Sequence, residues 1–133
     1  MACITSVSFV INVNGHMGGT FNGGRGLKKG DPLSPLLFVL TMEYFSRMMT
    51  LASSLSHFSF HPGSRAQSLQ HLMFVDDFFI FYKADPPTLQ IIMQTLRHFH
   101  CYSGLQANSN KSLVVSRGCA DDIQLECINI TGL

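Results

Sequence analysis

Residues 71–85 read HLMFVDDFFIFYKAD, and this stretch decides the fold. It joins two strand-like runs, residues 69–75 and 78–83, with Asp76 and Asp77 between them. Apolar runs separated by a two-residue junction are typical of a tight β-hairpin. The sequence therefore predicts an antiparallel hairpin with the Asp76-Asp77 pair as its turn.

The two adjacent carboxylates are the first candidate for chemistry. They interrupt a window, residues 72–82, in which the other nine positions are apolar. Two like charges side by side in such surroundings need neutralisation, and hard carboxylate oxygens that converge at a turn suit Mg²⁺. The alternative is an exposed hairpin tip with two solvated aspartates, because Asp is common in turns.

The chain upstream of this hairpin predicts a second hairpin and a helix. Residues 6–14 alternate apolar and polar positions and end at the turn signal Asn14-Gly15, followed by a glycine-rich return, residues 18–26. A helix is expected to begin near Ser34, with Pro35 in its first turn. Helical spacing predicts an apolar face made of Leu36, Leu40, Tyr44, Met48, Leu51 and Leu55.

Downstream, Asp85 is expected to cap a second helix that ends at Gly104. Its apolar face is predicted to be Leu89, Ile92, Met93, Leu96 and Phe99. Residues 112–116, SLVVS, predict a short strand. Residues 119–133 form a weakly patterned tail. The elements together predict an α+β fold, an antiparallel sheet with two helices packed on one face.

Composition sets the limits on function. The chain has 133 residues, room for one domain over residues 1–133, with 46% apolar and only 13% charged residues. A net charge of +1 argues against a stand-alone nucleic-acid binder, although not against a nucleic-acid enzyme whose basic parts lie elsewhere. No apolar run approaches the ~20 residues of a membrane helix. The N-terminus has no basic signal region, so an intracellular, nuclear or cytoplasmic protein that is not secreted is expected.

The cysteines give a weaker signal. Cys3, Cys101, Cys119 and Cys127 are scattered without a C-x-x-C pair. Four cysteines suffice for two disulfides, but free thiols are expected in a methionine-rich chain without an export signal.

Two loops carry lysines. Residues 26–35, GLKKGDPLSP, form a basic loop that includes Lys29 and leads into a helix N-terminus, where unpaired N–H groups favour a phosphate. The alternative is a surface loop with a good cap. Residues 103–112, SGLQANSNKS, combine a helix stop with a turn, and Lys111 is either functional or a solvated loop cation.

Three segments in this order resemble one family, the reverse transcriptases of non-LTR (LINE-type) retrotransposons, especially those abundant in plants. Residues 26–40, GLKKGDPLSPLLFVL, are similar to its G-L-R-Q-G-D-P-L-S-P motif and the helix that follows. Residues 71–85 are similar to its H-L-x-F-A-D-D-x-x-I-F motif, and residues 103–112 to S-G-L-x-x-N-x-x-K-S. The resemblance covers about residues 6–118.

The resemblance implies part of a polymerase palm domain with two Mg²⁺ ions. Asp76 would be the principal metal ligand, with Asp77 beside it, and Lys111 would lie near the nucleoside triphosphate. The surface against the template and the incoming nucleotide would comprise Lys29, Gly30, Asp31, Pro32, Leu33 and Ser34. The implied partners are an RNA template, a DNA primer and deoxynucleoside triphosphates.

The chain also departs from the family pattern. The family's first metal-binding Asp precedes the G-D-P-L-S-P motif, whereas the first acidic residue here is Asp31. Lys29 stands where the family usually has Gln, and Val75 where Ala is usual. The N-terminal fingers and palm segments and the C-terminal thumb are expected to be missing, so an incomplete palm without polymerase activity is predicted. The alternative function is a non-catalytic retrotransposon remnant or a weak RNA-binding module.

Overall fold

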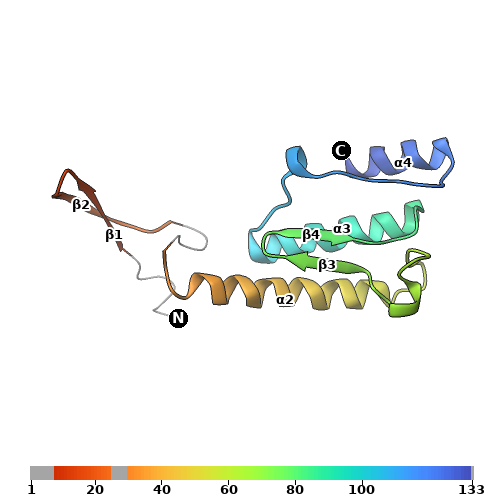
Figure 1. Ribbon diagram of the computed structural model, residues 1–133, viewed down its shortest axis with the longest axis horizontal. Helices are drawn as coiled ribbons and strands as arrows, with labels where there is room; N and C mark the ends of the chain where they lie inside the picture. The colour runs from red at the N-terminus through yellow and green to blue at the C-terminus, as the bar shows by residue number, and fades with distance from the viewer. Residues whose placement is uncertain (1–7, 25–29, 133) are drawn as a thin grey trace. The chain divides into compact units, whose positions relative to one another are not determined.

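The computed structural model describes residues 8–24 and 30–132. The chain divides into two compact units, residues 1–39 and 40–133, and each is described by itself. The elements are β1 (Ser8–Val13), β2 (His16–Asn22), α2 (Ser34–Ser53), η1 (Arg65–Gln67), β3 (His71–Phe74), β4 (Asp77–Ile80), α3 (Pro86–Ser103), η2 (Ser109–Lys111) and α4 (Asp121–Thr131), as drawn in Figure 1. The fold is α+β with two small antiparallel sheets, which confirms the predicted class.

The first unit contains the predicted N-terminal hairpin. β1 and β2 pair antiparallel, and the turn between them holds Asn14 at φ 50° and Gly15 at φ 85°. Two successive positive φ angles mark the turn that matches strand twist, which explains the Asn-Gly signal. The rings of Phe9 and Phe21 stack across the strands with centroids 5.6 Å apart.

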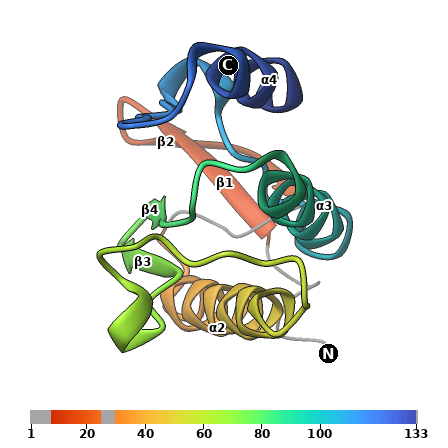
Figure 2. The same ribbon diagram turned by 90° about the vertical axis from the view of Figure 1, so that its right-hand side faces the viewer.

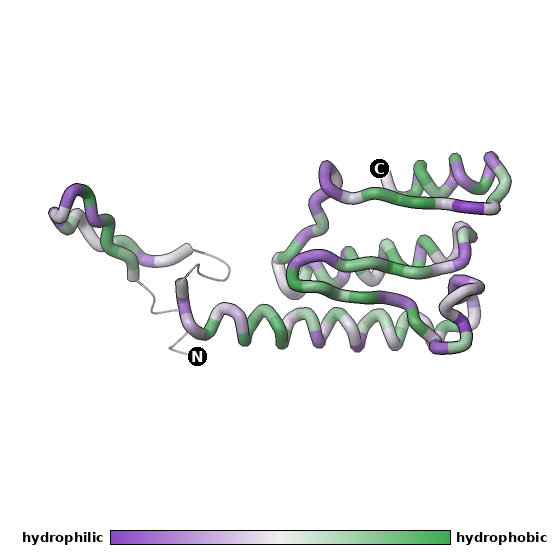
Figure 3. Tube along the Cα trace, in the orientation of Figure 1, coloured by the Kyte–Doolittle hydropathy of each residue, from purple (hydrophilic) through white to green (hydrophobic). Residues whose placement is uncertain are grey.

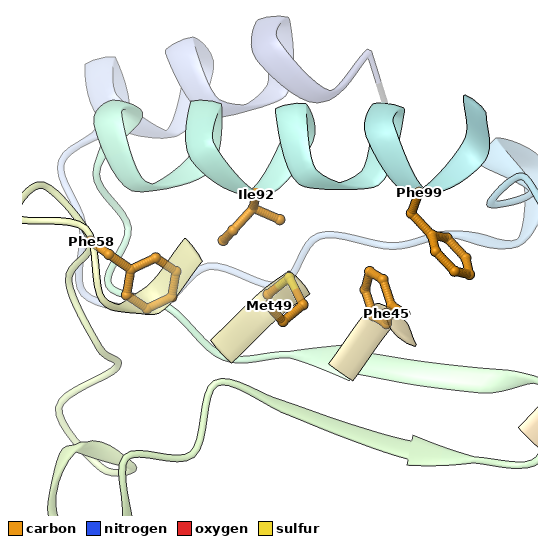
Figure 4. Packing of buried hydrophobic residues seen from close by; sticks show 5 residues of the cluster. All are labelled: Phe45, Met49, Phe58, Ile92 and Phe99. Carbon is orange, nitrogen blue, oxygen red and sulfur yellow. The ribbon is translucent and has the colours of Figure 1, made fainter. Parts of the chain in front are cut away.

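The second unit is built around one apolar cluster. Phe45, Met49, Phe58, Ile92 and Phe99 are buried together between α2 and α3, as Figure 4 shows. Phe45 lies at the centre, with ring centroids 4.9 Å from Phe99 and 5.4 Å from Phe78. The inner face of the β3–β4 hairpin packs on this cluster, so α2 and α3 cover one face of the hairpin (Figure 2).

The buried face of α2 differs from the predicted one. Leu51 and Leu55 are exposed, as are Leu36, Leu40 and Tyr44, and of the predicted face only Met48 packs against the core. The residues that are buried are Phe45, Met49 and Ala52. Apolar side chains occur all round this helix, so its periodicity alone does not select the face that the hairpin covers.

The termini of α3 follow the prediction. The Asp85 carboxylate accepts a hydrogen bond from the Thr88 N–H at 3.1 Å, and Gly104 at φ 72° ends the helix. Leu89, Ile92 and Phe99 are buried as expected, and Leu96 packs against the cluster. Thr88 and Thr95 are also buried, which the apolar spacing did not indicate.

One prediction for the C-terminal part is wrong. Residues 112–116 form no strand, because no neighbouring strand pairs with them in the described chain. The tail that lacked a clear pattern contains α4, which packs against α3 and buries Cys127.

Burial raises the pKa of the Cys127 thiol, and the nearby Cys119 thiol adds to the effect. Cys101, Cys119 and Cys127 are free thiols as expected, and Cys3 lies outside the described residues.

Candidate metal site on the β3–β4 hairpin

The turn of the hairpin lies one residue earlier than predicted. β3 and β4 pair with Phe74 opposite Asp77, so the two residues at the turn are Val75 and Asp76. Asp77 is the first residue of β4 rather than part of the turn. Val75 has a φ of 54°, a left-handed conformation that is unfavourable for a β-branched side chain. The two aspartates therefore occupy different backbone environments, a turn and a strand end.

Pleating decides which side chains accompany the aspartates. His71, Met73, Phe78 and Ile80 are half-buried on the face that meets the helices. Leu72, Phe74 and Phe79 are exposed on the opposite face, and Asp77 shares the alternation of Phe79. Asp76 and Asp77 are both exposed. Figure 3 shows the apolar hairpin broken by a short hydrophilic stretch at its turn.

A histidine holds the hairpin on α2 at the end remote from the turn. The Nε2 atom of His71 lies 2.9 Å from the Ser46 hydroxyl of α2, and the ring of Phe45 packs edge-on against the imidazole. The other ring nitrogen, Nδ1, is buried without a hydrogen-bond partner. Burial lowers the pKa of His71. The neutral imidazole is thus the form that this packing favours.

A threonine network fixes the chain at the start of α3. The Thr88 hydroxyl accepts from the Ser59 N–H at 2.9 Å and lies 2.7 Å from the Asp85 carboxylate and 3.2 Å from the His57 carbonyl. The Lys83 N–H also donates to the Ser59 carbonyl at 2.9 Å. The connection before η1 is thereby tied to the segment that leaves β4. Neither Ser46 nor Thr88 was singled out from the sequence, because a hydroxyl at one helical position carries no signal about its partner.

Lys111 lies at the end of η2, where it is exposed. The turn is local, with the Lys111 N–H donating to the Asn108 carbonyl at 3.0 Å and the Asn108 side chain accepting from Asn110. Within the described ranges, Lys111 forms no ion pair. Its predicted role near a triphosphate stays a prediction.

The predicted template and nucleotide segment belongs to the other unit. Asp31 shapes it, because its carboxylate accepts from the Leu33 N–H at 2.9 Å and its carbonyl accepts from the Ser34 N–H at 3.1 Å. Gly30 has a φ of 87°, which favours glycine. Pro32 lies between these residues, and Lys29 lies outside the described residues. The two units are not placed relative to one another, so the grouping of this segment with the aspartates stays a prediction.

The donor set at the hairpin fits a hard cation. Asp76 and Asp77 offer exposed carboxylate oxygens, the ligand type that Mg²⁺ prefers. Among residues 8–24 and 30–132, no group of three or more His, Cys, Asp or Glu side chains is arranged to hold a metal ion. The described chain therefore offers at most this pair for a metal at the hairpin.

Comparison with known proteins defines the family. A family model described as reverse transcriptase (RNA-dependent DNA polymerase) matches residues 2–132. An uncharacterized mitochondrial protein of Arabidopsis thaliana is 38% identical over 69 residues, which cover 49% of this chain and 54% of that protein. The chain thus spans about half the length of this curated relative.

No solved structure matches the chain. None of the helices in the described segments has the length and apolar character needed to cross a membrane. The family match extends over almost all of the sequence and includes both the aspartate hairpin and the Lys111 turn. The chain belongs to the reverse transcriptase (RNA-dependent DNA polymerase) family.

Proposed function

We propose that this chain is part of a palm domain of a non-LTR (LINE-type) retrotransposon reverse transcriptase, which extends a DNA primer on an RNA template. The observation that carries the proposal is the exposed Asp76-Asp77 pair at the tip of an apolar hairpin that is packed on two helices. The family match supports the same reaction class, nucleotidyl transfer from deoxynucleoside triphosphates.

The aspartates are proposed to hold Mg²⁺, with Asp76 as the principal ligand and Asp77 beside it. When bound, the metal would activate the primer 3′-hydroxyl and stabilise the leaving pyrophosphate. The protein's contribution is positional. The His71–Ser46 contact and the buried inner face of the hairpin fix β3 and β4 on α2, so that the two carboxylates are presented on a rigid ribbon.

Lys111 and the segment before α2 are proposed to bind substrates. Lys111 would lie near the triphosphate, where an exposed ammonium group neutralises phosphate charge. Residues 29–34 would line the template and the incoming nucleotide. The Asp31 carboxylate accepts a hydrogen bond from the Leu33 N–H and so defines the backbone just before α2, which suits a contact surface. These partners would place the protein inside the cell, in the nucleus or cytoplasm.

The chain alone is proposed to be inactive. No Asp or Glu precedes Asp31, so the upstream carboxylate that the family resemblance implies has no counterpart in this sequence. The loss of one carboxylate from a metal site lowers the rate of such enzymes by orders of magnitude, because the metals supply most of the charge stabilisation. Primer extension by the purified chain that disappears in Asp76→Ala would overturn this part of the proposal.

Metal binding gives a test that does not need activity. Mn²⁺, a paramagnetic substitute for Mg²⁺, should broaden the amide NMR signals of residues 74–79, and excess Mg²⁺ should reverse the effect. Asp76→Asn combined with Asp77→Asn should abolish it. The matched control is Asp121→Asn combined with Asp122→Asn, since these residues form a second adjacent and exposed pair at the start of α4.

Two outcomes of this titration, and a separate assay of RNA retention, are informative. The metal site is supported if the hairpin signals broaden in the natural chain and in the α4 double variant but not in the hairpin double variant. Broadening confined to α4, or absent at the hairpin, contradicts it. Salt-sensitive retention of RNA without any metal effect at the hairpin would favour the second reading, a remnant with weak RNA-binding ability.

A further inference from the structure

Two Asn-Gly dipeptides lie in the first unit, Asn14-Gly15 and Asn22-Gly23. An asparagine that precedes glycine is open to attack by the next amide nitrogen, because glycine has no Cβ to keep that nitrogen away from the carboxamide carbon. The remaining asparagines all precede residues that carry a side chain; they are Asn12, Asn108, Asn110 and Asn129. By sequence alone the two dipeptides are equally reactive, whereas the structure separates them.

The Asn14-Gly15 dipeptide is held in a closed turn. It connects β1 to β2, and the two strands pair right up to the turn (Figure 1). The Gly15 N–H donates a hydrogen bond to the side-chain oxygen of Asn12 at 3.0 Å. Ring closure requires this same nitrogen to lose its proton and to swing towards the Asn14 carboxamide. The hydrogen bond and the strand pairing oppose both steps, so the turn protects this dipeptide.

The Asn22-Gly23 dipeptide lies at the opposite, open end of the hairpin. Asn22 is the last residue of β2, so the bond that must rotate, between its Cα and its carbonyl carbon, is at the end of the strand. Its side chain is exposed. Within residues 8–24 and 30–132, no hydrogen bond holds the Gly23 amide or the Asn22 carboxamide. The two groups that react are therefore unrestrained by the described part of the chain.

We infer that Asn22 is a site of spontaneous deamidation, and that Asn14 is protected from the same reaction. The Gly23 nitrogen loses its proton and attacks the side-chain carbonyl carbon of Asn22, so that a C–N bond forms and closes a succinimide ring. The side-chain nitrogen leaves as ammonia and takes up a proton in place of the one that Gly23 lost. No oxidant or reductant is needed, and the inference does not depend on the proposed polymerase function.

Water completes the reaction. It adds to one of the two ring carbonyls that flank the former Gly23 nitrogen, the C–N bond to that carbonyl breaks, and the N–H is restored. Opening at the side-chain carbonyl yields aspartate, and opening at the main-chain carbonyl yields isoaspartate. Either product carries a new carboxylate, which lowers the net charge of the chain at pH 7 from +1 to 0.

The test follows the full chain during storage at pH 8. Cleavage after Arg25 releases residues 1–25, which contain both dipeptides. Fragmentation of this peptide in a mass spectrometer should place the replacement of NH₂ by OH at Asn22 roughly five times faster than at Asn14, the effect of one ordinary hydrogen bond. A sample taken at the start corrects for reaction during digestion. In urea that unfolds the chain, the two rates should become equal.

Variants of Asn12 test the protection of the turn. Asn12→Ala removes the acceptor of the Gly15 N–H and should raise the rate at Asn14 roughly fivefold, without a change at Asn22. Asn12→Asp keeps an acceptor oxygen and should retain the protection. The matched control is Thr20→Ala, which replaces another exposed polar residue of the hairpin away from the turn. It should leave the ratio of the two rates unchanged.

Several results would overturn the inference. They are equal rates at the two sites in the folded chain, a higher rate at Asn14, and a lack of reaction at Asn22 under conditions in which the unfolded chain reacts. A rise at Asn14 that is as large in Thr20→Ala as in Asn12→Ala would overturn the protective role of the Asn12–Gly15 hydrogen bond, because general opening of the hairpin would then control the reaction.

Discussion

At the scale of single residues, two side chains affect the stability of the β3–β4 hairpin. His71 supports it from behind, with one ring nitrogen 2.9 Å from the Ser46 hydroxyl and the other buried without a partner. Val75 forms its turn in a left-handed conformation. Each lowers the free energy of unfolding: His71 does so when its imidazole gains a proton, and Val75 does so at every pH.

The stability of the protein should fall in mild acid because of His71. Its pKa is lowered by burial in the folded state, so below the ordinary value of 6.5 the unfolded chain takes up the proton more readily. The free energy of unfolding is unaffected by this group above that pH and declines as the pH drops through and below it. Urea unfolding at pH 8 and pH 5.5 should show the decline, and His71→Gln should reduce it.

The control for this effect is His98→Gln, because His98 is exposed on α3. The free energy of unfolding of this variant should fall between pH 8 and pH 5.5 as much as that of the natural chain. An identical decline in the natural protein and in His71→Gln would show that other groups cause the acid sensitivity.

Replacement of Val75 by glycine should stabilise the protein. A left-handed φ costs an L-residue about 1–2 kcal/mol, and glycine loses about 0.5–1 kcal/mol through its freer unfolded chain. Val75 is 70% exposed, so little packing is lost. The expected gain in the free energy of unfolding lies between zero and about 1.5 kcal/mol, as measured by urea unfolding.

Val75→Ala keeps a Cβ in the left-handed conformation and should gain less than Val75→Gly. A glycine variant that is less stable than the alanine variant would mean that the turn does not adopt this conformation in solution.

At the scale of elements, the start of α3 contributes more to the stability of the protein than its sequence suggests. Thr88 is fully buried (0% exposed), and its hydroxyl bonds to the Ser59 N–H and the His57 carbonyl, both in the connection between α2 and η1. Thr88→Val keeps the shape but leaves the Ser59 N–H without its acceptor. An unsatisfied buried donor costs about 1–3 kcal/mol, which should appear as a lower urea midpoint.

Thr95→Val is the matched control on the same helix. Thr95 is buried as well, but its hydroxyl donates only to the Ile91 carbonyl within α3. This replacement should have little effect on the free energy of unfolding. Equal losses for both variants would show that the interelement contacts of Thr88 add nothing.

The sequence predicts where helices and strands lie better than it predicts which face of a helix is buried. The β3–β4 hairpin, the Asp85 cap and the Gly104 stop follow from local signals, and local signals are readable without the fold. The turn of the β3–β4 hairpin lies one residue before the predicted position, because Val75 adopts a left-handed conformation that a β-branched residue ordinarily avoids. The buried face of α2 was wrong, since Phe45 and Met49 compete with leucines spread round the same helix.

The candidate site was predictable only in part. The Asp76-Asp77 pair was found from its contrast with the apolar residues around it. Ser46 and Thr88 were not, because their roles depend on partners 25 and 29 residues away in the chain. The strand expected at residues 112–116 failed for a similar reason: strand propensity needs a neighbour before it becomes a sheet.

At the scale of the whole molecule, the two units should differ in local stability. The β1–β2 hairpin is exposed on almost every residue, and an isolated two-stranded hairpin is marginal in water. α3 contributes Leu89, Ile92 and Phe99 to the buried core. Native-state hydrogen exchange should therefore be fastest in β1 and β2 and slowest in the middle of α3. Equal protection in both units would contradict this picture.

The pleat of the β3–β4 hairpin has a consequence for how genes encoding this chain can diverge. Side chains on the outer face, such as Leu72 and Phe79, are free to be exchanged by point mutation. An insertion or deletion of a single codon within either strand would turn Met73 or Phe78 towards water and the outer residues towards α2. Descendants of this gene should therefore differ by substitutions in β3 and β4, but the number of codons that encode these strands should stay the same.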